Sequence, residues 1–397
     1  MLSVSEAIAR VLALVPRLPA EDVSLGDAVG RVLARPVDAG RDLPALPTSA
    51  MDGFAARAAE LPATLPVTHA VAAGATGDAI GVLAAGTATR IMTGGPLPAG
   101  ADTVVMFEDA SDHGATVALP ASAPGANVRP RGEDVAIGER AIDAGVRLGW
   151  SEVGLLAALG CARVPVARRP VVAIIATGDE LVDVGTVPAP GQVVDSSAYV
   201  LAAQIADAGG VPRYLGVARD SREAVQAMIE QALGADVVLT TGGVSVGDHD
   251  HVKPALAALG VALDFWKVAM KPGKPLAVAR HGAVPIFALP GNPVSSAVAF
   301  ELFVRPALLA MQGAAVTARP RTPVVLPDGY RKPPGRAHYL RAHLHREGER
   351  LIADLHPKQG SAILSSLVGL DALVEIAGEL GTIEAGGTTS ALLLRAV

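Results

Sequence analysis

The most constraining feature of this sequence is a glycine-rich loop that directly follows an apolar strand. Residues 236–241 are predicted to form a buried strand, and residues 242–250 then include three glycines, a serine and two aspartates. Glycine lets backbone N–H groups approach phosphate oxygens closely, the serine adds a donor, and aspartates can hold the accompanying divalent cation. An ordinary glycine-rich turn would also explain this loop taken alone. A second such loop, 289–295, follows another apolar strand, and two loops at the carboxyl ends of parallel strands would face one crevice.

Strand and helix patterns alternate around both loops, from residue 169 to about residue 313. This alternation predicts an α/β domain with a parallel sheet covered on both faces. The other predicted strands are 171–176 and 212–217, and the predicted helices are 196–208, 221–233, 251–259 and 294–311.

The flanking regions differ from this α/β pattern. A capping box at Ser3 and Glu6 predicts an N-terminal amphipathic helix, and a second helical segment lies at 151–159. The stretch between them is rich in Val, Thr, Gly, Pro and Ala with short strand-like runs, which indicates an inserted β module. We therefore predict a multidomain α/β plus β fold: a split linker domain (1–40 and 144–168), an inserted β domain (41–143), a parallel-sheet α/β domain (169–316) and a C-terminal β-barrel (317–397).

The composition restricts the possible partners. The chain is 50% hydrophobic, but no apolar run reaches the roughly 18 residues of a bilayer span, and residues 1–17 lack signal-peptide features. We expect a soluble, cytoplasmic protein with no membrane contact. The single Cys161 excludes intrachain disulfides and cysteine-cluster metal sites. A net charge of −6 and 3% aromatic residues argue against nucleic acid and favour a small-molecule partner.

Two further runs carry charges suited to phosphate chemistry. Asp179 and Glu180 follow the first strand of the α/β domain, where adjacent carboxylates could hold Mg²⁺ or form a solvated turn. Lys267, Lys271 and Lys274 lie within eight residues and suit phosphate or a molybdate-like oxyanion, although a solvated basic loop is the alternative.

Seven short motifs stand out along the chain. They are residues 49–53 (Ser-Ala-Met-Asp-Gly), 92–94, 131–134, 177–181, 242–247, 271–275 and 289–295. Their order is the one seen in the molybdopterin molybdenumtransferases, and the chain resembles the bacterial MoeA proteins and the gephyrin E domain over essentially its whole length. This resemblance implies a four-domain homodimer that converts adenylylated molybdopterin and molybdate to Mo-molybdopterin and AMP, assisted by Mg²⁺. It also implies a transient contact with the molybdopterin adenylyltransferase.

The resemblance also implies which residues form the site. Glu180 and Asp250 would be metal ligands, and Asp52 and Thr93 would act on the α/β domain of the other subunit. The implied catalytic residues are Asp52, Thr93, Glu180, Asp220, Asp250, Lys271 and Lys274. The implied cofactor-binding residues are Gly242, Gly243, Ser245, Gly247, Pro290, Gly291, Asn292, Ser295, Lys267, Arg341 and Ser361.

The chain departs from the family pattern at two places, one beside the motif that contains Asp52 and one in the α/β domain. Two other functions are also possible. Residues 46–48 are Leu-Pro-Thr where the family often has Phe-Asp-Asn, and Ser197 replaces a common Asn. The change at residues 46–48 removes polar groups near the loop that carries Asp52. One alternative is the adenylyltransferase itself, which resembles only the α/β domain and lacks the insertion. The other is a non-catalytic, gephyrin-like scaffold, which would not need the acids and lysines together.

Overall fold

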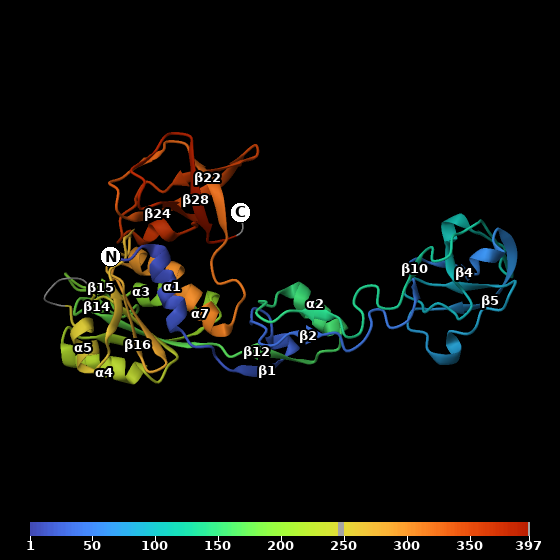
Figure 1. Ribbon diagram of the computed structural model, residues 1–397, viewed down its shortest axis with the longest axis horizontal. Helices are drawn as coiled ribbons and strands as arrows, with labels where there is room; N and C mark the ends of the chain where they lie inside the picture. Colours follow the sequence, from blue (N-terminus) through green and yellow to red (C-terminus); the bar gives the residue numbers. More distant parts are fainter. Residues whose placement is uncertain (245–249, 396–397) are drawn as a thin grey trace.

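The structure is a computed structural model that describes residues 1–244 and 250–395. The molecule is strongly elongated (Figure 1). The C-terminal barrel lies on the α/β domain at one end, the β insertion forms the opposite end, and the linker domain lies between them. The predicted fold class is therefore confirmed.

The α/β domain is built on a six-stranded sheet. Four neighbouring strands, β16, β13, β17 and β21, are parallel, as the alternating pattern predicts, but β20 and β18 add an antiparallel edge that it did not indicate. In spatial order the strands are β16 (Val211–Ala218), β13 (Val171–Thr177), β17 (Val237–Thr241), β21 (Val284–Leu289), β20 (Ala277–His281) and β18 (Leu263–Trp266). A short parallel pair, β14 (Leu181–Val182) and β15 (Val193–Val194), follows β13.

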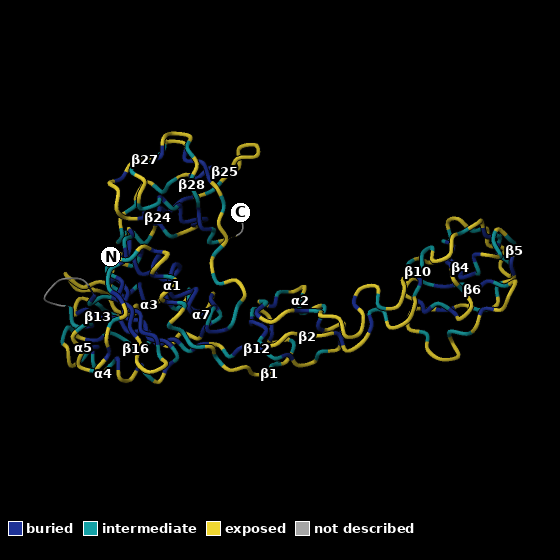
Figure 2. Tube along the Cα trace, viewed as in Figure 1, coloured by how far each residue is buried: buried dark blue, intermediate teal, exposed yellow. Residues whose placement is uncertain are grey.

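Helices cover both faces of this sheet. Successive strand residues point to opposite faces, so Ile174 joins one buried cluster and Ile175 the other. Buried segments run through this domain (Figure 2). The first face is covered by α3 (Ser197–Asp207), α6 (Pro293–Ala299) and α7 (Arg305–Gln312), and the second by α4 (Arg222–Ala232) and α5 (Val252–Ala258).

A π-helical segment, Phe300–Val304, joins α6 and α7 into one central helix. Within the described parts of the chain, this helix, Pro293–Gln312, is the one long and apolar enough to cross a membrane. Its apolar stretch is 94% buried inside the protein, so we assign it as the core helix of the α/β domain.

The N-terminal helix α1 (Val4–Leu14) begins with the predicted capping box: Ser3 N–H donates to Glu6 Oε2 (2.8 Å), and Glu6 N–H donates to Ser3 Oγ (3.2 Å). Its assignment to the linker domain was wrong. Val4, Ala7 and Val11 are buried in the main α/β cluster, against α7 and the π-helical segment. The physical reason is that an apolar helix stripe packs onto the largest accessible apolar surface, which this central helix offers.

The linker domain joins two distant chain segments. Antiparallel pairing of β1 (Ala20–Ser24) with β12 (Arg163–Ala167), and of β2 (Val37–Asp38) with β11 (Arg140–Ile142), brings both ends of the insertion together. Helix α2 (Trp150–Ala158) packs on these pairs, and the partly buried Cys161 lies in the same apolar cluster.

The inserted domain is a six-stranded sheet. Its strands, in spatial order, are β7 (Thr103–Met106), β4 (Gly53–Ala56), β6 (Ala88–Ile91), β5 (Ala63–Val71), β9 (Thr116–Leu119) and β8 (Ser111–Asp112), and β3 (Thr48–Ser49) pairs with β10 (Val128–Arg129).

The C-terminal sheet closes on itself, because β24 pairs with both β25 and β26. Around the barrel the strands are β24 (Ala337–Glu347), β25 (Arg350–Leu355), β22 (Arg321–Leu326), β28 (Gly387–Leu393) and β26 (Ala372–Ile376), with a side pair of β23 (Tyr330–Arg331) and β27 (Thr382–Ile383). The barrel is attached to the α/β domain by β19 (Met270–Lys271), which pairs with β24.

Candidate active site

The two glycine loops meet at the carboxyl ends of β17 and β21. Gly242 N–H donates to the Leu289 carbonyl (3.1 Å), and a Cβ on Gly291 would lie 3.4 Å from the Gly242 Cα. Gly242 has φ +88°, and a Cβ there would come within 2.7 Å of Thr177 Oγ1, so only glycine fits. The prediction that both loops face one crevice is confirmed.

This crevice, which we call the glycine-loop cavity, has a volume of about 710 Å³. Acidic and small polar side chains dominate its wall. The lining residues are Thr177, Gly178, Glu180, Leu181, Val193, Val194, Asp195, Ser196, Ser197, Asp220, Thr241, Gly242, Gly243, Gly291, Asn292, Pro293 and Ala362.

Asp195 is an acid of this cavity that sequence analysis did not select. Its carboxylate accepts hydrogen bonds from Ala198 N–H (3.1 Å) and the Tyr214 hydroxyl (2.9 Å). Burial raises the pKa of Tyr214, and the Asp195 charge raises it further, so the phenol stays a donor. An Asp just before a predicted helix is usually interpreted as a helix cap. The sequence therefore gives no signal that distinguishes this buried Asp from an exposed one.

Two predicted acids, Glu180 and Asp220, both line the glycine-loop cavity. The turn that carries Glu180 is tied to Asp220, because Asp179 N–H donates to Asp220 Oδ2 (3.4 Å) and Asp220 N–H donates to Asp179 Oδ1 (3.3 Å). In the described residues no group of three or more His, Cys, Asp or Glu side chains is arranged to hold a metal ion. Mg²⁺ is commonly bound by one or two carboxylates together with substrate phosphates, so Glu180 and Asp220 fit that donor set.

Asp250 lies elsewhere. Its side chain is 8% exposed, and Oδ2 lies 3.1 Å from Lys253 Nζ, which in turn lies 3.8 Å from the centre of the Trp266 ring. Burial raises the pKa of Asp250 despite the opposing effect of the Lys253 charge. The structure thus does not bring Asp250 and Glu180 together in the glycine-loop cavity as a metal pair.

A second hollow, the interdomain cleft, lies between the α/β domain and the barrel and has a volume of about 620 Å³. It collects three cationic side chains, Lys271, Lys274 and Arg336. Arg336 was missed from sequence, because it reaches the lysines only through the pairing of β19 with β24. The lining residues are Met270, Lys271, Pro272, Gly273, Lys274, Pro275, Pro290, Asn292, Ser295, Arg336, Gln359, Gly360 and Ser361.

Asn292 lines both hollows and so marks their boundary. Its Nδ2 donates to Ser361 Oγ (3.1 Å), and the Ser361 carbonyl accepts from Val294 N–H (3.1 Å). Residues predicted from sequence for cofactor binding therefore gather here from two domains, with Pro290 and Ser295 on the cleft side.

Arg341 and Lys267 lie outside both hollows. Arg341 is 1% exposed, and its guanidinium donates to Ser366 Oγ (3.1 Å) and to the carbonyls of Lys358 (3.1 Å) and Gly360 (3.0 Å). It thus supports the loop that precedes Ser361. Lys267 Nζ lies 3.6 Å from the centre of the Trp266 ring.

His338 lies beneath the cationic wall of the cleft. It is 5% exposed, its Nδ1 lies 3.0 Å from the Tyr330 hydroxyl, and it is the strand partner of Lys271. Burial lowers the pKa of His338 to about 4, and the charges of Lys271, Lys332 and Arg336 act in the same direction. The ring is therefore neutral near pH 7 and adds no charge to the cleft.

Asp52 and Thr93 hydrogen-bond to each other in the insertion. Asp52 Oδ1 accepts from Thr93 N–H (2.6 Å) and Thr93 Oγ1 (2.8 Å), and these bonds lower the pKa of Asp52. The insertion is at the opposite end of the molecule from the glycine-loop cavity (Figure 1). The structure thus does not bring this pair to the cavity of its own chain. Two other predicted residues, Ser245 and Gly247, lie outside the described residues.

Three family models match consecutive parts of the chain. The MoeA N-terminal region (domain I and II) matches residues 2–160, a probable molybdopterin binding domain matches residues 173–310, and the MoeA C-terminal region (domain IV) matches residues 323–394. The similarity therefore covers all four structural units.

Individual relatives match over similar lengths. The chain is 38% identical over 379 residues to molybdopterin molybdenumtransferase 2 of Mycobacterium tuberculosis, covering 92% of each chain. It is 35% identical to the molybdopterin molybdenumtransferase of Bacillus subtilis, covering 99% of this chain and 94% of that one. The crystal structure of the molybdopterin biosynthesis moeA protein from Pyrococcus horikoshii has a TM-score of 0.85 and 30% identity, covering 99% of this chain and 100% of that one.

Proposed function

This chain belongs to the MoeA family of molybdopterin molybdenumtransferases, and from that premise we propose that it inserts molybdate into adenylylated molybdopterin, giving Mo-molybdopterin and AMP. The observation that carries this proposal is the adjacency of an acidic cavity and a cationic cleft that share Asn292. Both substrates are anionic. Molybdate suits the cationic cleft, and the larger pterin nucleotide suits the larger cavity, whose acids can bind the divalent cation that accompanies its pyrophosphate.

The interdomain cleft would hold molybdate. Lys271, Lys274 and Arg336 supply positive charge, and the hydroxyls of Ser295 and Ser361 supply neutral donors. Charged hydrogen bonds to an oxyanion are about twice as strong as neutral ones, and a lysine ammonium adapts to oxygens in several directions. Ser361 would lie nearest the reacting partner, because it contacts Asn292 at the boundary.

The glycine-loop cavity would hold the adenylylated pterin. Its glycines leave room for backbone to approach phosphate oxygens, and the buried Asp195 carboxylate offers acceptors to N–H groups. We propose that Glu180 and Asp220 hold Mg²⁺, whose charge would offset that of the pyrophosphate. The protein needs no cysteine for the molybdenum, because the dithiolene of the pterin supplies the sulfur ligands.

We also propose that the working form is a homodimer in which Asp52 and Thr93 of one subunit complete the site of the other. The support is their distance from the cavity of their own chain and their mutual hydrogen bonds, which keep Asp52 charged and oriented. We place this enzyme in the cytoplasm, with a transient contact to the adenylyltransferase that supplies its substrate.

The proposed reaction is tested by AMP release. Purified protein is mixed with adenylylated molybdopterin and Mg²⁺, with and without molybdate, and AMP is quantified by chromatography. We expect AMP release that saturates with molybdate and is retained in Arg346→Ala, an exposed position of the barrel. No molybdate dependence in the wild-type protein would refute the proposed reaction.

The shared site is tested with mixed dimers. Asp52→Ala and Glu180→Gln homodimers should each be nearly inactive, whereas a purified mixed dimer should recover up to about half of the wild-type activity by two-fold symmetry. Recovery arises because one of its two sites receives neither substitution. A verified mixed dimer that stays inactive would mean that Asp52 does not act on the other subunit.

A further inference from the structure

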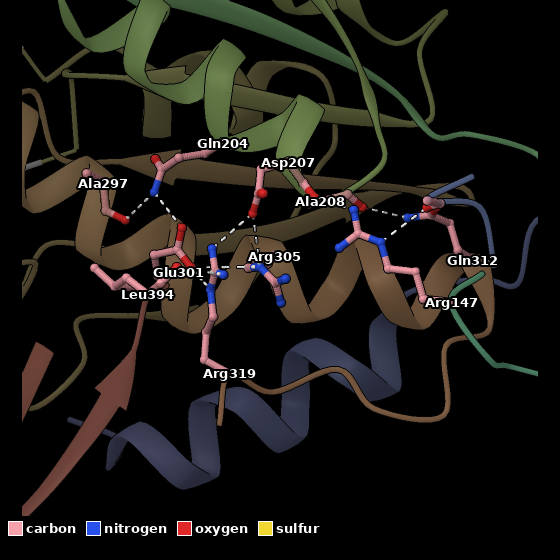
Figure 3. A network of polar contacts seen from close by, with 11 residues as sticks. Arg147, Gln204, Asp207, Ala208, Ala297, Glu301, Arg305, Gln312, Arg319 and Leu394 are labelled. Carbon is pink, nitrogen blue, oxygen red and sulfur yellow. Dashed lines mark hydrogen bonds and ion pairs between the residues drawn. The ribbon is translucent and has the colours of Figure 1, made fainter. Parts of the chain in front are cut away.

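Arg319 lies in the tether between the α/β domain and the barrel and hydrogen-bonds to three separate elements (Figure 3). Its Nε donates to Glu301 Oε2 (2.9 Å), Nη2 to Asp207 Oδ2 (3.0 Å) and Nη1 to the Leu394 carbonyl (3.1 Å). The side chains of Arg319 and Glu301 are only 16% and 8% exposed. Because water is largely excluded around Arg319 and Glu301, that bond holds its partners more firmly than a surface ion pair does, whereas the Asp207 side chain is exposed.

Two more arginines complete this network. Arg305 Nε lies 3.8 Å from Asp207 Oδ2 and 3.9 Å from Glu301 Oε2, and Arg147 of the linker domain donates to the Asp207 carbonyl (2.9 Å). We call these five residues the charged hub. The α/β domain, the linker domain, the tether and the end of the barrel chain all meet there (Figure 3).

The central helix connects the charged hub to the interdomain cleft. Glu301 lies on the same central helix as Ser295, six residues further on, which is roughly 9 Å along the axis. Glu301 belongs to the π-helical segment Phe300–Val304, whose five residues are all buried. Such segments are rare and are frequently found at functional sites. Here the π-helical segment carries Glu301, the buried acceptor for Arg319.

The barrel side of the hub also leads to the cleft. Leu393 N–H donates to the Pro320 carbonyl (2.9 Å) beside Arg319, and Leu394 N–H donates to the Asp371 carbonyl (2.8 Å). Asp371 ends the segment 361–371, which begins with Ser361 and packs Leu370 into the main apolar cluster. Arg319 therefore links two walls of the cleft: the barrel segment that begins with Ser361, and the central helix that carries Ser295.

We infer that Arg319 is a positioning residue that sets the spacing of the two walls of the interdomain cleft and thereby the affinity for molybdate. This inference rests on the proposed function of the cleft. Arg319 touches no substrate; it acts through Ser361 and Arg336 on the barrel side and Asn292 and Ser295 on the helix side. The pairing of β19 with β24 and the shared apolar cluster also hold the barrel on the α/β domain. Loss of the Arg319 side chain should therefore loosen the cleft without releasing the barrel.

Arg305 should allow the Arg319→Ala variant to fold, so that its effect on the cleft can be measured. It remains close to both carboxylates, the buried one of Glu301 and the exposed one of Asp207, so both keep a counter-charge when Arg319 is removed. We expect Arg319→Ala to stay folded. Arg319→Lys serves as the conservative variant, because an ammonium keeps the charge near Glu301 but cannot make all three fork-like hydrogen bonds.

The test compares molybdate binding and kinetics in wild type, Arg319→Ala, Arg319→Lys and the control Arg346→Ala. Calorimetric titration with molybdate alone should show binding on the order of tenfold weaker in Arg319→Ala, intermediate in Arg319→Lys and unchanged in the control. In turnover, KM for molybdate should rise while kcat at saturation stays near wild type. Equal molybdate affinity in wild type and Arg319→Ala would overturn the inference, as would a lower kcat with unchanged KM.

Hydrogen exchange provides a readout that does not depend on catalysis. Val294 and Ala337 donate across the domain boundary to the carbonyls of Ser361 and Ala269, and both N–H groups should exchange faster in Arg319→Ala. If wild type itself binds no molybdate, the proposed role of the cleft fails. Unchanged exchange in Arg319→Ala would separately refute the role of Arg319, whatever the cleft binds.

Discussion

The glycine-loop cavity and the interdomain cleft share a residue but are built in different ways. The cavity is formed almost wholly by strand ends and loops of one domain, whereas the cleft needs β19, the central helix and the barrel together. The cavity thus depends on backbone shape within one core. The cleft depends on side-chain charge and on how two domains dock, so substitutions should affect the two hollows by different mechanisms.

The largest expected effect breaks the cavity alone. Gly242→Val adds a β-branched side chain where φ is +88° and Thr177 Oγ1 and its carbonyl already lie within 2.8 Å of a Cβ. Left-handed strain and overpacking together should lower the free energy of unfolding by about 3 kcal/mol or more. Urea unfolding measures this, and AMP release should fall below detection.

Gly260→Val is the matched control for this strain. Its φ is +71°, but no atom lies within 4 Å of a Cβ there, so only the left-handed strain remains. Equal losses of stability in both variants would contradict the proposed contact with Thr177. Titration with molybdate should show that Gly242→Val retains the interdomain cleft.

The next prediction concerns the pH dependence of the free energy of unfolding, through His338 near the cleft. The pKa of His338 is about 4 in the folded protein but near 6.5 when exposed, so the unfolded chain binds a proton first as pH falls. Stability from this group is present above pH 6.5 and is lost as pH falls towards 4, by up to roughly 3 kcal/mol. Urea unfolding at several pH values should show this loss in wild type. The slope should flatten in His338→Gln, and an unchanged slope would exclude His338 as its source.

Lys271→Ala should separate the two hollows by substrate. Removing one ammonium from an oxyanion site typically costs about 1.5–3 kcal/mol, so half-saturation by molybdate should rise roughly 10- to 150-fold. Half-saturation by the adenylylated pterin should change much less. Arg331→Ala, an exposed cation in β23, is the control. A larger effect on the pterin than on molybdate would reverse the assignment of the cleft.

The smallest effect sharpens the boundary between the hollows. Ser361→Ala removes the hydrogen bond from Asn292, worth about 0.5–1.5 kcal/mol. Because Asn292 lines both hollows, half-saturation should rise a few-fold for both substrates. Ser365→Ala, an exposed serine of the same segment, should change neither. An effect on molybdate only would place Ser361 wholly in the cleft.

The difference between features formed within one segment and features formed between distant segments also explains what the sequence could predict about the fold. Apolar periods and capping residues are local, so β13, α3 and α4 were predicted to within two residues. The antiparallel edge of β20 and β18 was not predicted, because strand direction depends on pairing between segments. The packing of α1 was mispredicted for a similar reason: its apolar stripe was evident, but not the distant surface that covers it.

Site prediction followed the same rule. The glycine loops and Glu180 were found because each follows a recognisable strand of one domain, and Asp220 was implied by the family resemblance. Arg336 was missed because only the pairing of β19 with β24 brings it to Lys271. Asp195 was not selected, since burial and a tyrosine partner leave no local pattern.

The position of α1 also bears on how the chain is made. Residues 4–14 leave the ribosome well before their packing partner, α7, which begins at Arg305. At about 5–20 residues per second, translation must continue for roughly 15–60 s before that partner exists. During this interval the apolar stripe of Val4, Ala7 and Val11 has no native cover, while the linker and insertion behind it can already fold. Residues 4–14 are therefore synthesised early in this chain but buried late.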